Sequence, residues 1–354
     1  MDEKILLVGL GGFGKHHVRV WNDLGLLDRL KVVDLDPQAL DKYNAGRNNF
    51  PGVSFPELKP EQFSTDISGV FNEATVLDIV TQADAHYDLC IEGLEKDKAI
   101  LVEKPMTLTS DQALKLDGKV REKSGRLQVG FHYRYNDLTT KANEMINSGE
   151  LGDIRYFKGE FKGFKRPRTD VGVTHSDGIH FVDLLMYLTG TDPIRIQSTM
   201  ASYLARSRAG YPEPFTFDDF SISTMKFRTE AGDVPAVIEA GYIQPGEKAD
   251  PYVPGAMTTK KLEIGGSKAT LVIDYEGKSA ILYDASHTRD NPSSPWKFQN
   301  NGSRNLDIVV RDPLRNEFEA FLDCLKTGKT PLASSHESVR TQLAIEAIYR
   351  AAQR

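Results

Sequence analysis

Glycines recur at short intervals near the N-terminus. The run Gly9, Leu10, Gly11, Gly12, Phe13 and Gly14 has the spacing G-x-G-x-x-G, after an apolar stretch and before a helix-like one. In this context the first glycine allows a tight turn, the second lets the backbone approach a pyrophosphate, and the third lets helix and strand pack closely. The start of the helix supplies N–H donors and positive potential to phosphates. The pattern predicts dinucleotide binding by Gly9, Gly11, Gly12, Phe13 and Gly14.

An acidic residue follows at the expected interval. Residues 30–33 read as a strand that ends at Asp34, about 20 residues after Gly14. A carboxylate there accepts hydrogen bonds from both ribose hydroxyls and repels a 2′-phosphate. Asp34 therefore favours NAD over NADP as the cofactor. The alternative is that Asp34 and Asp36 only start a helix, because Asp36-Pro37 resembles an N-cap followed by proline.

The first third of the chain alternates strand and helix patterns. Strands are expected at residues 4–8, 30–33, 76–80, 99–103 and 127–131, with helices between them. This alternation predicts a doubly wound parallel sheet in an α/β fold, over residues 1–130. Ligands of such sheets bind beyond the carboxyl ends of the strands. There the glycine turn, Thr81-Gln82 and Glu103-Lys104 are expected to converge.

The rest of the chain, residues 131–354, predicts a second, α+β domain. Short alternating segments predict an antiparallel sheet, at residues 156–161, 194–203, 220–227, 236–242, 260–264, 269–273 and 280–283. A long helix follows, with Phe318, Phe321, Leu322 and Leu325 on one face. Segments 204–218 and 284–306 are polar and contain proline, so we expect loops. The first is either a substrate lid or a plain surface loop.

Several motifs together resemble the Gfo/Idh/MocA family, the relatives of glucose–fructose oxidoreductase and inositol dehydrogenase. They are Glu103-Lys104-Pro105, the glycine run with His17 after it, and the stretches at 85–105, 129–135, 148–157 and 178–190. The resemblance implies NAD(P) binding in the first domain, with Thr81, Gln82, His86, Glu103 and Lys104 near the cofactor. It also implies a large, mostly antiparallel open sheet that often forms the subunit interface of a homodimer or homotetramer. Substrates of such proteins are sugars, cyclitols, sugar phosphates or nucleotide sugars.

The resemblance also implies two catalytic groups. Oxidation of a secondary alcohol needs a base for the hydroxyl proton and stabilisation of the developing alkoxide, while the cofactor takes the hydride. Lys104 is expected to point at the substrate hydroxyl, and Pro105 to follow a cis peptide bond. We expect His180 to act as the acid/base, because an imidazole pKa suits proton transfer near neutral pH.

One part of the family pattern is displaced. The family has D-x-G-x-H, but here Ser176 occupies the place of the acid before His180, and Asp177 is shifted by one residue. One residue turns a helical side chain by about 100°. Either the local backbone differs so that Asp177 still reaches the site, or His175 or Ser176 binds substrate, or His180 relays the proton alone. Asp177 is taken as the third catalytic residue. The expected substrate contacts here are His175, Ser176, Asp177 and His180.

A basic segment marks a further candidate for substrate binding. Five cations and two phenylalanines lie between residues 158 and 168, among them Lys165 and Arg166. These cations, with Arg134, are candidates for binding an anionic substrate group, although a solvated basic loop is the plainer interpretation. Four other histidines read mostly as structural: His16, His17, His86 and His132. No metal-ligand spacing is present, so no metal is expected.

Composition excludes several classes of protein. The 354 residues are 40% hydrophobic and 27% charged, with a net charge of −6, which argues against nucleic-acid binding. No stretch has the apolar length of a membrane span or a signal peptide, and the two cysteines form no framework, so we expect a cytoplasmic protein. Two functions remain open: a dehydrogenase, or a sensor on the same fold that binds dinucleotide without turnover.

Overall fold

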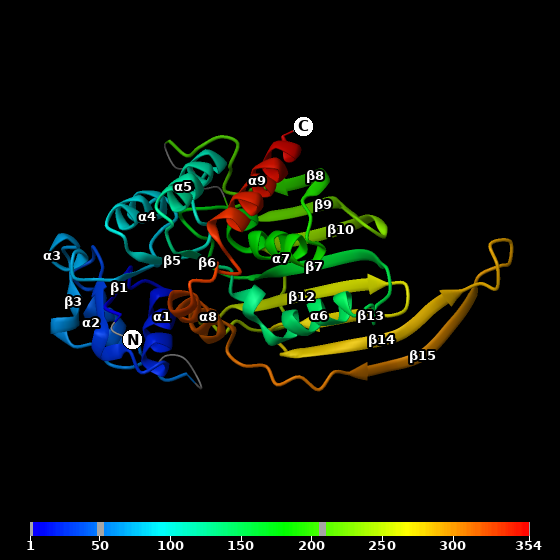
Figure 1. Cartoon of the computed structure of the whole chain (residues 1–354), viewed down its shortest axis with the longest axis horizontal. Helices are drawn as coiled ribbons and strands as arrows, with labels where there is room; N and C mark the ends of the chain where they lie inside the picture. The colour runs from blue at the N-terminus through cyan, green and yellow to red at the C-terminus, as the bar shows by residue number, and fades with distance from the viewer. Residues whose placement is uncertain (1–2, 48–52, 205–209, 354) are drawn as a thin grey trace. The chain divides into compact units, whose positions relative to one another are not determined.

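Six apolar segments of the N-terminal third form a parallel sheet (Figure 1). The computed structural model describes residues 3–47, 53–204 and 210–353. It separates into unit 1, which comprises Met1–Phe131, Pro251–Pro254 and Leu314–Gln342, and unit 2, which comprises His132–Asp250, Gly255–Pro313 and Leu343–Arg354.

The sheet of unit 1 has the strand order β3-β2-β1-β4-β5-β6. Its strands are β1 Ile5–Val8, β2 Leu30–Val33, β3 Phe63–Ser64, β4 Val76–Ile79, β5 Ala99–Glu103 and β6 Leu127–Gly130. Every residue of β1, β4, β5 and β6 is buried, as expected for a parallel sheet covered on both faces. The order changes direction between β1 and β4, and ligands bind at this kind of switch point.

Helices complete unit 1. They are α1 Gly14–Asp23, α2 Ala39–Gly46, α3 Ser68–Phe71, α4 His86–Glu95, α5 Ser110–Glu122 and α8 Pro313–Thr327. Phe318 and Phe321 of α8 are fully buried in the same core as Trp21 and Val18 of α1. The helical periodicity expected around Phe318 therefore lies on α8. Helix α9, Ser335–Ala352, has its first residues in unit 1 and the rest in unit 2.

Unit 2 contains a nine-stranded sheet. The order is β15-β14-β13-β12-β7-β10-β9-β8, with β11 paired to β12. All pairs are antiparallel except β7 with β10. The strands are β7 Ile154–Phe164, β8 Pro193–Ala201, β9 Phe220–Thr229, β10 Gly232–Gly241, β11 Lys248–Ala249, β12 Met257–Gly266, β13 Thr270–Asp274, β14 Ser279–Thr288 and β15 Lys297–Asn305. The predicted fold class is confirmed.

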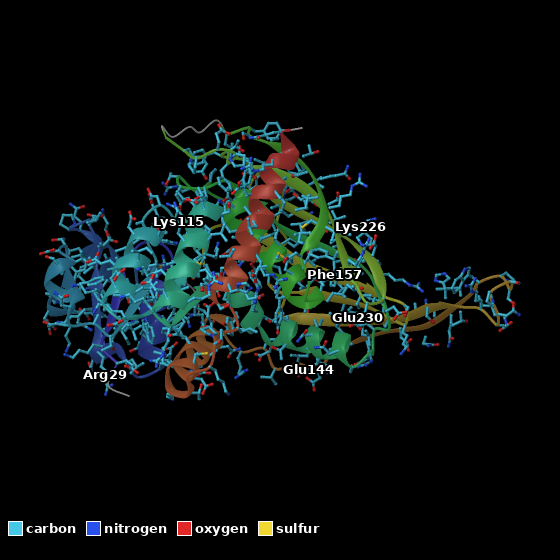
Figure 2. All side chains as sticks on the ribbon, turned by 45° about the horizontal axis from the view of Figure 1, so that its top comes forward. Arg29, Lys115, Glu144, Phe157, Lys226 and Glu230 are labelled. Carbon is cyan, nitrogen blue, oxygen red and sulfur yellow. The ribbon has the colours of Figure 1, made fainter. Side chains whose placement is uncertain are left out.

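Two helices of unit 2 cover one face of this sheet, α6 Asp137–Asn147 and α7 Ile179–Thr189 (Figure 1). Phe157 (labelled in Figure 2) and Phe161 of β7 are buried, while Phe164 is 59% exposed. A Cβ on Gly159 would lie 2.7 Å from the ring of Phe181, so this glycine lets α7 approach the strand. Odd-numbered residues of β7 therefore face α7, and even-numbered residues face away.

The expectation of a loop over residues 284–306 is wrong. Strands β14 and β15 pair along this segment and form a hairpin that extends past the other strands of unit 2 (Figure 1). All nine residues of β15 are exposed, so their polarity, which suggested a loop, reflects a strand without a buried face. In segment 204–218, residues 205–209 lie outside the described residues, and the described remainder has no helix or strand.

Candidate active site

The glycine turn lies between β1 and α1 in unit 1. Gly9 has φ +104°, and a Cβ there would lie 2.7 Å from the carbonyl oxygen of Val80. A Cβ on Gly14 would lie 2.1 Å from the carbonyl oxygen of Gly9. At Gly11 and Gly12 a Cβ would meet no other atom within 4 Å. Backbone packing therefore requires glycine at Gly9 and Gly14. Gly11 and Gly12 leave open space for a pyrophosphate at the start of α1.

Asp34 lies directly after β2, beside this turn. Its Oδ2 accepts a hydrogen bond from the backbone N–H of Leu10 at 2.7 Å, and its Oδ1 accepts one from Asp36 at 2.9 Å. The carboxylate lines a pocket of about 390 Å³ together with Gly11, Gly12 and Tyr43. Asp36 shapes the next turn by accepting a hydrogen bond from Gln38 ahead of α2. The pocket therefore combines an open glycine turn with a carboxylate at the end of a strand.

His86 connects the loops that follow β4 and β5. Its Nδ1 lies 2.8 Å from the carbonyl oxygen of Pro105, and its Nε2 lies 3.2 Å from that of Thr81. The side chain is 1% exposed. The hydroxyl of Thr81 donates to the carbonyl oxygen of Gln82 at 3.2 Å. His86 thus joins the two loops that carry Thr81 and Lys104.

Lys104 follows β5 and is partly exposed. Its backbone N–H donates to Oε2 of Glu103 at 3.2 Å, and its peptide bond to Pro105 is cis. Glu103 is 6% exposed, so the strand end is buried while the lysine next to it reaches the surface of unit 1.

Unit 1 also contains a buried cluster of charged side chains next to Lys104, which was not predicted from the sequence. The Nδ1 of His17 is 2.9 Å from Oδ1 of Asp78, and its Nε2 is 3.4 Å from Oε1 of Glu103. The indole of Trp21 donates to Oδ2 of Asp78 at 2.7 Å. Burial alone would lower the pKa of His17, but the charge and hydrogen bond of Asp78, with Glu103, raise it to about 10. The two carboxylates therefore favour the protonated form of His17, whose contacts link α1, β4 and β5.

In unit 2, the residues that depart from the family pattern form a π-helical turn, Thr174–Gly178, ahead of α7. A π-helical turn contains more residues than an α-helical one, and such turns are frequent at functional sites. The Oδ2 of Asp177 lies 2.5 Å from Nζ of Lys165. Ser176, which occupies the acid's place, instead shares a 2.5 Å hydrogen bond with the hydroxyl of Tyr242. The ring of His175 stacks on Phe215, with ring centres 4.9 Å apart.

The π-helical turn is held in place by Asp218. Thr174 donates to Oδ2 of this carboxylate from its backbone and its hydroxyl, at 3.0 and 2.6 Å. The hydroxyl of Tyr349 on α9 donates to Oδ1 at 2.6 Å. Burial raises the pKa of Asp218 to about 6, against the opposing effect of these hydrogen bonds.

His180 lies one turn further along, among aromatic rings. It stacks on Phe161 with ring centres 6.0 Å apart, and the rings of His132 and Tyr133 are each 5.0 Å away. The ammonium of Lys165 lies 4.6 Å from the centre of the same Phe161 ring. Lys165, which contacts Asp177, and His180 therefore lie against the same phenylalanine ring.

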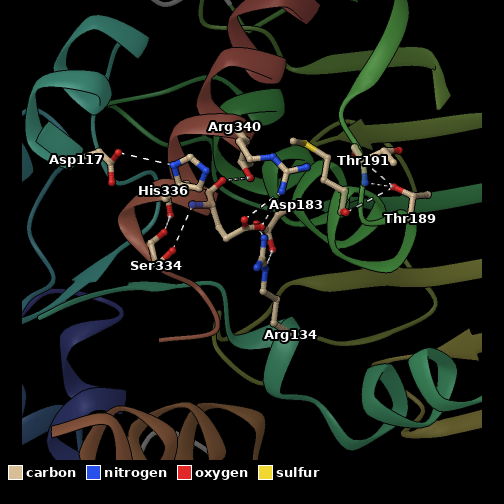
Figure 3. Close-up of polar contacts among 12 residues, drawn as sticks. Asp117, Arg134, Asp183, Thr189, Thr191, Ser334, His336 and Arg340 are labelled. Atoms are coloured by element: carbon tan, nitrogen blue, oxygen red, sulfur yellow. Dashed lines mark hydrogen bonds and ion pairs between the residues drawn. The ribbon is translucent and has the colours of Figure 1, made fainter. Parts of the chain in front are cut away.

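Arg134 has a different environment from the one expected of a substrate contact. Its guanidinium donates to both oxygens of Asp183, at 2.7 and 2.8 Å (Figure 3). Both side chains are 1% exposed. This geometry joins the segment after β6 to α7, and the expected substrate contact stays a prediction.

The basic segment divides between the two faces of the sheet. Lys158 and Lys162 are even-numbered residues of β7 and pair with Glu160 on the face away from α7, at 2.7 and 3.1 Å. Past the end of the strand, Lys165 contacts Asp177, and Arg168 forms two hydrogen bonds with Asp170, at 2.8 and 2.5 Å. Arg166 is exposed.

A buried lysine of β12 was also not predicted from the sequence. Lys260 of β12 is 3% exposed, lies 3.0 Å from Oδ2 of Asp250 and contacts Glu276. Its Nζ is 4.9 Å from the centre of the Phe161 ring, on which His180 stacks. The signal available in the sequence was a lysine two residues before Leu262, on the same, inward-facing side of the strand.

The strand order and the glycine turn of unit 1 are those of a dinucleotide-binding Rossmann fold. Two family profiles match the chain: the oxidoreductase family NAD-binding Rossmann fold over residues 3–131, and the C-terminal alpha/beta domain of the same family over residues 143–354. The chain belongs to the Gfo/Idh/MocA family of oxidoreductases.

Individual relatives are more distant. The scyllo-inositol 2-dehydrogenase (NAD(+)) of Bacillus subtilis is 33% identical over 144 residues, which are 38% of this chain and 42% of that protein. The chain spans about half the length of the curated relatives it matches, between 42% and 61% for three of them.

Solved structures match the fold over almost the whole chain. UDP-N-acetylglucosamine 3-dehydrogenase GnnA from Acidithiobacillus ferrooxidans has a TM-score of 0.75 at 18% identity, covering 99% of this chain and 97% of that one. The WlbA dehydrogenase from Bordetella pertussis, in complex with NADH and UDP-GlcNAcA, has a TM-score of 0.71 at 19% identity, covering 100% and 97%.

Two further findings concern the described residues alone. None of their helices combines the length and apolar character needed to cross a bilayer. Within the same part of the chain, no group of three or more His, Cys, Asp or Glu side chains is arranged to hold a metal ion.

Proposed function

We propose that this protein is an NAD-dependent dehydrogenase that transfers hydride between the nicotinamide and a hydroxyl-bearing carbon of a sugar, cyclitol or sugar derivative. The main support is that the open glycine turn and Asp34 line one pocket, in a chain of this oxidoreductase family. The names of the relatives, an inositol dehydrogenase and nucleotide-sugar dehydrogenases, support the substrate range.

The cofactor would be held by unit 1. Backbone N–H groups after Gly11 and Gly12 would bind the pyrophosphate, and Asp34 would accept the ribose hydroxyls. The loops with Thr81, Gln82, His86 and Glu103 would flank the nicotinamide half. When bound, NAD accepts or returns the hydride, and the protein supplies proton transfer and orientation.

The proton chemistry is assigned to Lys104 and His180. The Lys104 ammonium would donate a hydrogen bond to the reacting oxygen and stabilise alkoxide character as the O–H proton leaves. His180 would accept that proton during oxidation and return it during reduction. Asp177, held by Lys165, would contact substrate hydroxyls beside His180. Ser176 and His175 would shape the same wall, and Arg134 and Arg166 remain candidates for substrate contact.

The alternative function is a sensor that binds dinucleotide without turnover. The observation in its favour is Ser176, which replaces the acid of the family pattern and is bonded to Tyr242. Reduction of NAD⁺, followed by absorbance across a panel of sugars, cyclitols and their derivatives, separates the two. Turnover that Lys104→Ala abolishes supports the dehydrogenase. Tight NAD binding without turnover in either direction supports the sensor.

Assembly and location are part of the proposal. Tyr156 and Phe164 lie on the face of β7 away from α7 and are 38% and 59% exposed, which supports a homodimer or homotetramer through this sheet. We also propose a cytoplasmic location, because the two cysteines, Cys90 and Cys324, are free thiols.

A further inference from the structure

Each buried or half-buried cation around Phe161 has a carboxylate partner within unit 2. Lys165 contacts Asp177, and Lys260 contacts Asp250. Both ammonium groups lie over the same aromatic ring, at 4.6 and 4.9 Å from its centre. His180 stacks on that ring as well. The residue proposed as acid/base therefore lies among cations whose charges are balanced by carboxylates of the protein, one at Lys165 and two at Lys260.

Other cations near Phe161 are also paired with carboxylates. Arg168 is paired with Asp170, whose hydrogen bond and charge raise the pKa of the guanidinium against the opposing effect of burial. The negative charge of Asp177 adds to this increase. Lys158 and Lys162 belong to the opposite face of β7, where they pair with Glu160. Of the cations in this basic segment, Lys158 and Arg166 are exposed.

This arrangement disfavours an anionic substrate group. A phosphate or carboxylate placed here would have to compete with Asp177 for Lys165, or leave Asp177 as a buried charge without its cation. Removing one partner from a buried ion pair is costly, because the other charge stays desolvated. A negative ligand would also lie within a few ångströms of carboxylates, which repel it.

The same pair suits an uncharged polyol. An ammonium has three N–H donors and a carboxylate has about four acceptor positions, so the ion pair keeps capacity for further hydrogen bonds. Each sugar hydroxyl both donates and accepts, so neighbouring hydroxyls can bind the two groups of the pair at once. The pair is 9% and 8% exposed, and the rings of Phe161 and Tyr242 hold the lysine by cation–π contacts.

We propose that the Lys165–Asp177 pair is a polyol-recognition element, which selects an uncharged sugar or cyclitol over its phosphorylated counterpart. This inference rests on the proposed function and narrows its substrate class. In this proposal the cations of the basic segment pair with carboxylates of the protein. They do not serve to bind an anionic group of the substrate.

The test compares matched ligands by calorimetry, with NADH present. The probes are myo-inositol and D-glucose against myo-inositol 1-phosphate and D-glucose 6-phosphate. The wild-type protein should bind at least one neutral probe about tenfold or more tightly than its phosphate ester. Asp177→Asn, which releases Lys165 from its anion, should shift this ratio about tenfold towards the phosphate. Lys165→Met should weaken the neutral probes without improving the esters.

Asp233→Asn is the matched control, because it makes the same change at an exposed pair with Lys226 and Arg228 (Lys226 is labelled in Figure 2). It should leave the ratio unchanged. Tighter binding of the esters by the wild type, binding of no neutral probe, or equal ratios in the Asp177 and Asp233 variants would each overturn the inference. Turnover is scored separately: selective binding of a neutral probe without NAD⁺ reduction refutes the proposed dehydrogenase and leaves the recognition element standing.

Discussion

Replacing Asp78 by asparagine tests whether the buried cluster in unit 1 is an ion pair. Asp78 is fully buried and accepts from Trp21 and from His17, whose pKa is raised to about 10. An asparagine side chain has one acceptor oxygen and would turn its NH₂ group towards one of the two donors. Breaking a buried pair in this way costs roughly 3 to 5 kcal/mol of unfolding free energy. A rise of the His17 pKa from 6.5 to about 10 corresponds to about 5 kcal/mol, which agrees in size.

The pH dependence gives the sharper signature. Because the folded-state pKa of His17 is raised, its stabilisation is complete below pH 6.5 and is lost as the pH rises through about 10. Between these values the free energy of unfolding of the wild type should fall by up to about 1.4 kcal/mol per pH unit from this group. The difference in stability between the wild type and Asp78→Asn should therefore shrink from pH 7 to pH 10.

The assay is urea unfolding followed by tryptophan fluorescence. The chain has two tryptophans, so in a Trp296→Phe background the signal comes from Trp21, which contacts Asp78 itself. Asp111→Asn, at an exposed pair with Lys115 in the same unit, is the control and should have a much smaller effect. If Asp78→Asn costs less than about 1 kcal/mol and its difference from wild type does not vary with pH, the cluster is not an ion pair.

Four further predictions concern the proposed site and the assembly. Lys104→Ala should lower kcat by about a hundredfold or more while NAD affinity measured by calorimetry stays close to wild type; a large loss of affinity instead would make Lys104 a cofactor ligand. Asp34→Ala should weaken NAD binding about tenfold and leave NADP binding little changed, and tighter NADP than NAD binding by the wild type would contradict the role of Asp34. Because burial raises the pKa of Asp218 to about 6, its ionisation destabilises the fold. The wild type should lose up to about 3 kcal/mol relative to Asp218→Asn as the pH rises from 4 to 6, and a constant difference in urea titrations would refute this. Phe164→Asp should convert the proposed oligomer to monomer in light scattering, and an unchanged mass would move the interface elsewhere.

Patterns within one element were predictable from the sequence. The glycine turn and strands β2 and β5 could be located because spacing, apolar runs and turn residues are local properties. Contacts between distant residues were not. Asp78 lies 61 residues from His17, and nothing in either segment indicates that the two side chains meet. The acid inside an apolar strand was the one available signal.

The π-helical turn shows the same limit at the candidate site. The displaced acid at Asp177 was visible in the sequence, and a change in the local backbone was among the three interpretations. Its partner Lys165 was also visible, but as part of a basic run. That the two meet depends on where β7 ends and how the turn before α7 is wound, which only the folded chain determines.

The β14–β15 hairpin has a practical consequence for protein engineering. Residues 289–295 at its end are exposed or half-exposed, and β15 contributes no buried side chain to unit 2. Exposed tips of this kind tolerate insertions and are the first places that proteases cut. An epitope, a fluorophore or a fused domain placed there would leave the glycine turn, the π-helical turn and both cores unaltered. The hairpin is thus a natural attachment point for immobilising the protein on a surface.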